Sequence, residues 1–289
     1  EQRHLLPHGT GPSTLFGVTN FFRGNPRLLL LALPVAFAMI VLKWLYDASS
    51  ARHVDFSPLL TGIIAAEVFI VGFMLSGTAG DFKEAERLPG EVAASLEAIA
   101  DECLIVDTEL KLPEARQCVA QLVEIGQSVR MWLLTNSDFD EVMADLRALN
   151  PLFIVFAPKI QAGFTTRLKS EQATIRRLVI RMDTMRRTSY VSAGYLIAEV
   201  IALAIFVLLL VTQIGPLAPT LLAVGVVTCL LTYVLALIRD LDNPYEYHRG
   251  KPGAADVQLD VLEQTEHRLR SLLTTMGASA SAATPVSSP

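Results

Sequence analysis

The chain has 289 residues, of which 52% are hydrophobic and 18% are charged. A soluble domain of ordinary size does not need that much apolar content, so the composition points to a membrane protein. The net charge of −5 is small and argues against nucleic acid as a partner.

Four segments are long and apolar enough to cross a bilayer, which takes roughly 20 mostly apolar residues in one helix. The expected spans are about 28–46, 58–77, 191–214 and 217–238. A turn of Gly215 and Pro216 joins the last two into a tight hairpin, and a polar loop joins the first two. Lys43, Trp44 and Tyr46 close the first span with side chains that are typical interfacial anchors.

Basic residues collect before the first and third spans and after the second and fourth. By the positive-inside rule, both termini and the central segment are expected in the cytoplasm. The predicted divisions are a cytoplasmic N-terminal segment 1–27, a transmembrane hairpin 28–77, a helical cytoplasmic domain 78–190, a second hairpin 191–238, a cytoplasmic C-terminal segment 239–275 and a disordered tail 276–289.

The central segment is expected to be helical almost throughout, because no stretch alternates apolar and polar residues as a strand does. One helix is predicted over about 89–100, and another from Pro113 to about Leu134. A third should follow Ser137 as its cap and stop at Asn150 and Pro151. From about residue 166 the chain is expected to remain helical into the third span. The fold class is therefore an all-α membrane protein.

Catalysis has little support in the sequence, which contains no phosphate-binding loop, zinc-protease motif or nucleophile elbow. The five histidines are scattered, and Cys103, Cys118 and Cys229 lack metal or redox spacing. We expect no enzyme activity, no cofactor and no metal site.

The second span carries the residues that bear on function. Ala65, Phe69 and Phe73 recur every four residues and so share one stripe of the helix. Such a stripe ordinarily faces lipid or the core, and the alternative is an aromatic ring that gates a narrow pore by dewetting. Glu67 lies about 200° around the helix from Ala65 and should face neighbouring helices. Glu67, and Glu199 in the third span, are candidates for a buried polar role or for ion contact.

Three motifs, in order, resemble the bestrophins. V-G-F at 71–73 is followed by E-A-E-R-L-P-G-E at 84–91, where bacterial members carry a phenylalanine and then E-A-R-K-L-W-G-E. D-N-P-Y at 242–245 resembles the family's [DN]-P-F element, and D-V-Q-L-D-V-L at 256–262 resembles D-L-P-L-D-A-L. The layout of four spans around a helical cytoplasmic segment is also similar to that family.

The resemblance implies a homopentameric ion channel in which monovalent ions pass down their gradient through one central pore. Ala65, Phe69 and Phe73 match the family's hydrophobic neck, although Ala65 is smaller than the usual residue there. The positive edges of the aromatic rings favour anions such as chloride, whereas acidic residues in the vestibule would favour cations. The expected location is the bilayer of a bacterial inner membrane.

The sequence also departs from the family. Phe82 and Lys83 replace paired tryptophans after the neck, and the residues after Glu246 do not form the acidic run that binds calcium in animal members. These departures leave open a non-conducting membrane scaffold or signalling protein. A proton-coupled transporter that uses Glu67 and Glu199 has less support, because four spans are few and no inverted repeat is visible.

Overall fold

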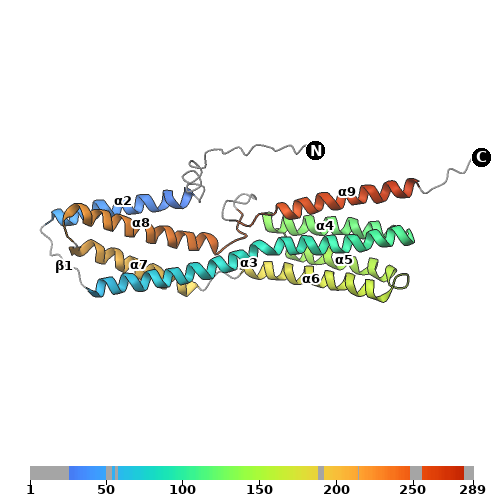
Figure 1. Cartoon of the computed structure of the whole chain (residues 1–289), viewed down its shortest axis with the longest axis horizontal. Coiled ribbons are helices and arrows are strands. Elements are labelled where there is room, and N and C mark those ends of the chain that lie inside the picture. Colours follow the sequence, from blue (N-terminus) through green and yellow to red (C-terminus); the bar gives the residue numbers. More distant parts are fainter. Residues whose placement is uncertain are drawn as a thin grey trace, which may run out of the picture. The chain divides into compact units, whose positions relative to one another are not determined.

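The computed structural model of the chain describes residues 26–49, 54–55, 58–187, 192–213, 215–247 and 256–282. The expectations for most of the N-terminal segment, for the junction at 188–191, for the stretch 248–255 and for the end of the tail lie outside these residues. The elements, drawn in Figure 1, are α2 Pro26–Ala48, β1 Val54–Asp55, α3 Pro58–Leu110, α4 Pro113–Thr135, α5 Phe139–Phe156, α6 Ala162–Arg187, α7 Ser192–Val211, β2 Thr212–Gln213, α8 Leu217–Leu241 and α9 Asp260–Ala282.

The described residues are almost entirely helical, which confirms the predicted all-α class. The strands β1 and β2 have two residues each and pair in parallel, Val54 with Thr212 and Asp55 with Gln213. Three helices are long and apolar enough to cross a membrane: α2, α3 and α8. The described apolar part of α7, Tyr195–Val211, is shorter. The fourth span therefore stays a prediction.

The chain divides into two compact units. The first, here called the membrane unit, comprises the residues up to Val71 together with Ala198–Leu237. The second, the helical unit, comprises Gly72–Ile197 and the residues from Ile238 onward. Helices α3, α7 and α8 each contribute residues to both units.

The membrane unit has a small apolar core. Ile205 and Leu209 of α7 are buried with Val224 and Leu231 of α8, and side chains of α2 and α3 pack against them. Helix α8 approaches α2 closely at Gly225, where a Cβ atom would lie 2.6 Å from Cδ1 of Ile40. Small residues at such contacts let apolar helices approach each other in a membrane.

Lys43 is buried inside the membrane unit, so its predicted role as an interfacial anchor is wrong. Its Nζ donates hydrogen bonds to the carbonyl oxygens of Leu210, at 3.0 Å, and Thr212, at 2.8 Å. It also forms an ion pair with Asp47 at 2.8 Å. The last carbonyls of a helix have no partner within the helix. The lysine therefore joins the end of α2 to the end of α7.

The helical unit contains the larger core, which draws on α3, α4, α5, α6 and α9. Within this unit α9 packs on α4, α4 on α5, and α5 on α6, as Figure 1 shows. Large side chains are fully buried there, including Trp132 of α4 and Phe153 and Phe156 of α5. Burial of such side chains stabilises the unit by about 1.5–3 kcal/mol each.

Several predicted helix boundaries need correction. Helix α5 continues through Pro151 to Phe156. An interior proline costs about 3 kcal/mol, which the burial of Phe153 and Phe156 beyond it offsets. The cap of α5 is Asp138, which accepts a hydrogen bond from the Asp140 N–H at 3.0 Å, rather than Ser137. Helix α9 continues past residue 276 to Ala282, into the stretch predicted to be disordered. The predicted start of α4 at Pro113 is confirmed.

Helix α3 also passes the expected boundary at Gly77 and continues through Pro89 to Leu110. Because proline has no N–H, the carbonyl four residues earlier loses its helical donor, and that carbonyl belongs to Ala85. The Tyr245 hydroxyl donates a hydrogen bond to this same oxygen at 2.8 Å. Ala85 and Tyr245 are both fully buried. Tyr245 therefore supplies the donor that Pro89 lacks.

We expect Tyr245→Phe to lower the stability of the chain by about 1–3 kcal/mol, the cost of leaving a buried acceptor unpaired. In a Pro89→Ala background, residue 89 again has an N–H that can donate to the Ala85 carbonyl. Tyr245→Phe should therefore lower the stability much less in that background. Thermal unfolding of the four variants in detergent, followed by circular dichroism, measures the coupling. Equal losses in both backgrounds would show that the hydroxyl does not compensate for the proline.

Candidate functional site

The predicted stripe of the second span lies on the outward face of α3. Phe69 and Phe73 leave 74% and 69% of their surface exposed, and Ala65 is exposed as well. On the opposite face Val71 and Met74 are buried. The two phenylalanines thus form an apolar surface that no other described part of the chain covers.

Glu67 lies on the inward face of α3, and none of its surface is exposed. Among the described residues, neither of its carboxyl oxygens has a hydrogen-bond partner. Its position opposite the Phe69 stripe is the one that helical periodicity predicted. Glu199, the other candidate, lies exposed on α7. In the described structure no hydrogen bond joins the two carboxyl groups.

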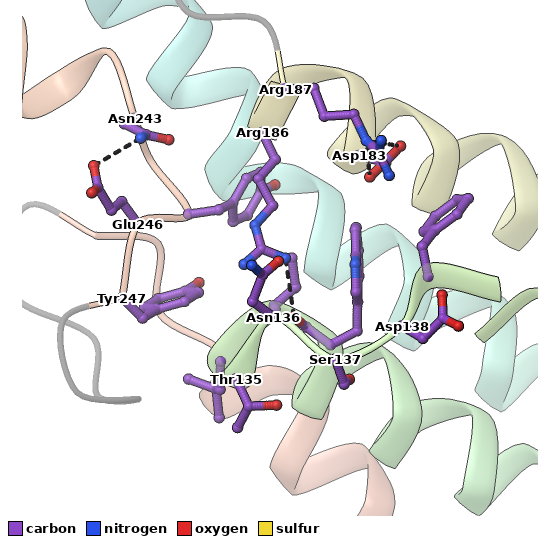
Figure 2. A pocket seen from close by; sticks show the side chains of 15 residues that line it. Thr135, Asn136, Ser137, Asp138, Asp183, Arg186, Arg187, Asn243, Glu246 and Tyr247 are labelled. Atoms are coloured by element: carbon purple, nitrogen blue, oxygen red, sulfur yellow. Dashed lines mark hydrogen bonds and ion pairs between the residues drawn. The ribbon is translucent and has the colours of Figure 1, made fainter. Parts of the chain in front are cut away.

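A second feature, a pocket of about 680 Å³, lies entirely within the helical unit (Figure 2). Its walls are the end of α4 with the following loop, the last turn of α6 and the segment after α8. Its lining residues include Trp132, Asn136, Asp183, Arg186, Arg187 and Tyr247. No pattern in the sequence predicted a pocket at this place.

Arg186 organises this pocket. Figure 2 shows its side chain reaching from α6 towards the end of α4, beside Asn136. Its Nη1 donates to the Trp132 carbonyl at 3.0 Å, and its guanidinium lies over the Trp132 ring, 5.6 Å from the centroid. Asn136, in the left-handed conformation, donates its N–H to the same carbonyl. Burial lowers the pKa of Arg186. The arginine therefore caps the negative end of α4.

Other polar side chains around the pocket bind one another. Asp183 pairs with Arg187 at 2.8 Å, and the Asn243 amide donates to Glu246 at 2.8 Å. The Tyr247 hydroxyl donates to the Val257 carbonyl at 2.9 Å, and burial raises the pKa of that tyrosine. Among the described residues no group of three His, Cys, Asp or Glu side chains could hold a metal ion. The pocket is therefore a place where three chain segments meet.

Comparison of the sequence with protein-family models finds no match. A search of curated proteins likewise finds no matching relative. Solved structures do match. A bacterial bestrophin homologue from Klebsiella pneumoniae has a TM-score of 0.68 and 15% sequence identity, over 86% of this chain and 97% of that chain. Two substituted variants of that protein give the same TM-score at 15% and 16% identity, over 86% and 85% of this chain and 98% and 97% of theirs.

The chain has the fold of a bacterial bestrophin homologue. The likeness of fold extends over most of both chains, which confirms the resemblance that the three sequence motifs indicated. Together with the three helices that are long and apolar enough to cross a bilayer, it establishes a membrane protein.

We expect Arg186→Met to loosen the end of α4 and lower stability by about 0.5–2 kcal/mol, because a capping hydrogen bond and a favourable charge at the helix terminus are lost. Arg187→Met is the matched control, since that side chain is 70% exposed and its ion pair contributes less than about 1 kcal/mol. Hydrogen exchange of peptides covering residues 132–139 should accelerate in the first variant only. Similar exchange in both variants would contradict the capping role.

Proposed function

We propose that the chain forms a homopentameric, bestrophin-like channel that passes monovalent ions down their gradient. The observation that carries the proposal is the exposure of Phe69 and Phe73 on the outward face of a candidate span. Five such helices around one axis would line a narrow neck with aromatic rings. The pore would be wider at the level of the five Ala65 side chains. The likeness of fold to bacterial bestrophin homologues supports the assignment.

The physical mechanism is partial dehydration. An ion entering an apolar constriction leaves part of its hydration shell, and the constriction conducts only while it stays wet. The edges of phenylalanine rings carry partial positive charge, so rings presented edge-on would stabilise an anion more than a cation. We therefore propose that chloride passes in preference to sodium.

The proposed arrangement in the membrane follows the basic residues that flank the spans. Helix α7 would serve as the fourth span, with residues 188–191 leading into it. Both termini and the helical unit would lie in the cytoplasm of a bacterium, beneath its inner membrane.

Flux through the purified protein in liposomes tests the proposal. We expect a Phe69→Ala, Phe73→Ala double variant to pass chloride about tenfold faster than the unaltered chain, the change produced by a barrier lower by about 1.4 kcal/mol. Replacing the chloride gradient by a sodium gradient measures charge selectivity. Light scattering of the detergent-solubilised protein should give a particle of five chains.

Phe37→Ala is the matched control, because Phe37 is 68% exposed on α2, outside the proposed neck. Its flux should equal that of the unaltered chain. Absence of flux from every variant would reject the channel and favour a non-conducting membrane scaffold. A flux that requires a proton gradient would favour a transporter instead.

A further inference from the structure

Glu67 stands out among the buried polar groups of the membrane unit. It follows Ile63 and Ile64 by one helical turn and precedes Val71 by another, so its carboxyl group lies on the face that packs inward. None of its surface is exposed, and neither oxygen accepts or donates a hydrogen bond. A carboxyl group in such surroundings has lost its water and gained no polar partner.

No described residue forms a hydrogen bond with this carboxyl group. Lys43 is the buried cation of the same unit, and its Nζ is engaged by Asp47 and by the carbonyls of Leu210 and Thr212. The titratable groups described on the helices beside α3 are Lys43, Tyr46 and Asp47 on α2, Tyr195 and Glu199 on α7, and Cys229, Tyr233, Arg239 and Asp240 on α8. In the described residues none of them forms a hydrogen bond with Glu67.

The free energy of burying such a group differs greatly between its charged and neutral forms. Burying an isolated carboxylate costs far more than burying a neutral polar group, and an ionised side chain inside a bilayer is expensive on every scale. A neutral acid can also donate a hydrogen bond, which a carboxylate cannot. The Thr228 hydroxyl, on the inward side of α8, is buried and lacks a partner as well.

We propose that Glu67 is a proton-binding site within the membrane unit. The carboxyl group holds its proton while the helices are packed, and the O–H bond breaks only when water reaches it, which releases the proton to that water and leaves a carboxylate. Proton binding and helix packing are then linked. At neutral pH the folded chain carries one proton that the unfolded chain has lost, so rising pH should reduce stability. The proposal does not depend on the proposed channel.

The test compares the full chain with Glu67→Gln, which keeps the shape of the side chain but does not titrate. The thermal unfolding midpoint of the unaltered chain in detergent should fall as the pH rises from mildly acidic to mildly alkaline. The glutamine variant should be as stable as the unaltered chain at acidic pH. Its unfolding midpoint should fall less than that of the unaltered chain as the pH rises. In the infrared spectrum at neutral pH, the unaltered chain should show the carbonyl stretch of a protonated carboxylic acid, and the variant should lack it.

Two controls separate this site from other causes. Glu199→Gln removes an exposed acid, and Thr228→Val removes a buried hydroxyl that does not titrate. Both variants should keep the pH slope and the infrared band. If Glu67→Gln fails to fold, Glu67→Asp should still shift the position of the band. A band that persists unchanged in the glutamine variant, or a glutamine variant much less stable than the unaltered chain at acidic pH, would overturn the proposal.

Discussion

The hydrogen bond from the Tyr245 hydroxyl to the Ala85 carbonyl is the interaction on which the course of α3 depends. Pro89 removes the helical donor to that carbonyl, and a buried acceptor without a partner is costly. The Tyr245 hydroxyl, 160 residues later in the sequence, donates the missing hydrogen bond. With the carbonyl satisfied, α3 can continue to Leu110 and place Val92, Leu96 and Ile99 in the core of the helical unit.

The same bond connects two departures from the bestrophin motifs. Proline stands where bacterial members carry tryptophan in the run at 84–91, and tyrosine stands where they carry phenylalanine after N-P. Each substitution alone would leave one polar group unpaired: an orphan carbonyl in the first case, a buried hydroxyl in the second. Together they satisfy each other, so the two positions are physically coupled.

Three charged side chains that are wholly or partly buried differ in their partners. Lys43 has three oxygen partners, and Arg186 caps α4 and lies over the Trp132 ring. Glu67 has no such partner. Since a buried charge needs compensation, the protonated form proposed for Glu67 would follow from the same rule.

Periodicity and local signals predicted much of the fold. The apolar runs placed α2, α3 and α8, the proline at 113 gave the start of α4, and the 100° step per residue placed Glu67 opposite Phe69. Local signals failed where distant residues decide the outcome. The helix breakers Pro89 and Pro151 are overruled by tertiary contacts, and no pattern near Lys43 or Arg186 indicates their distant carbonyl partners. Only the orphan carbonyl implied by Pro89 could have suggested that a buried donor was needed.

The buried lysine of the membrane unit also bears on the order in which the chain assembles. The carbonyl partners of Lys43 lie 167 and 169 residues later in the sequence. During synthesis from the N-terminus, α2 is therefore made before the carbonyl groups that finally accept hydrogen bonds from Lys43. Until α7 arrives, Asp47 and interfacial water must solvate the charge of this lysine, since a bare ammonium cannot enter the hydrocarbon. The contact between the end of α2 and the end of α7 can form only after α7 has been made, so the membrane unit completes its packing late in synthesis.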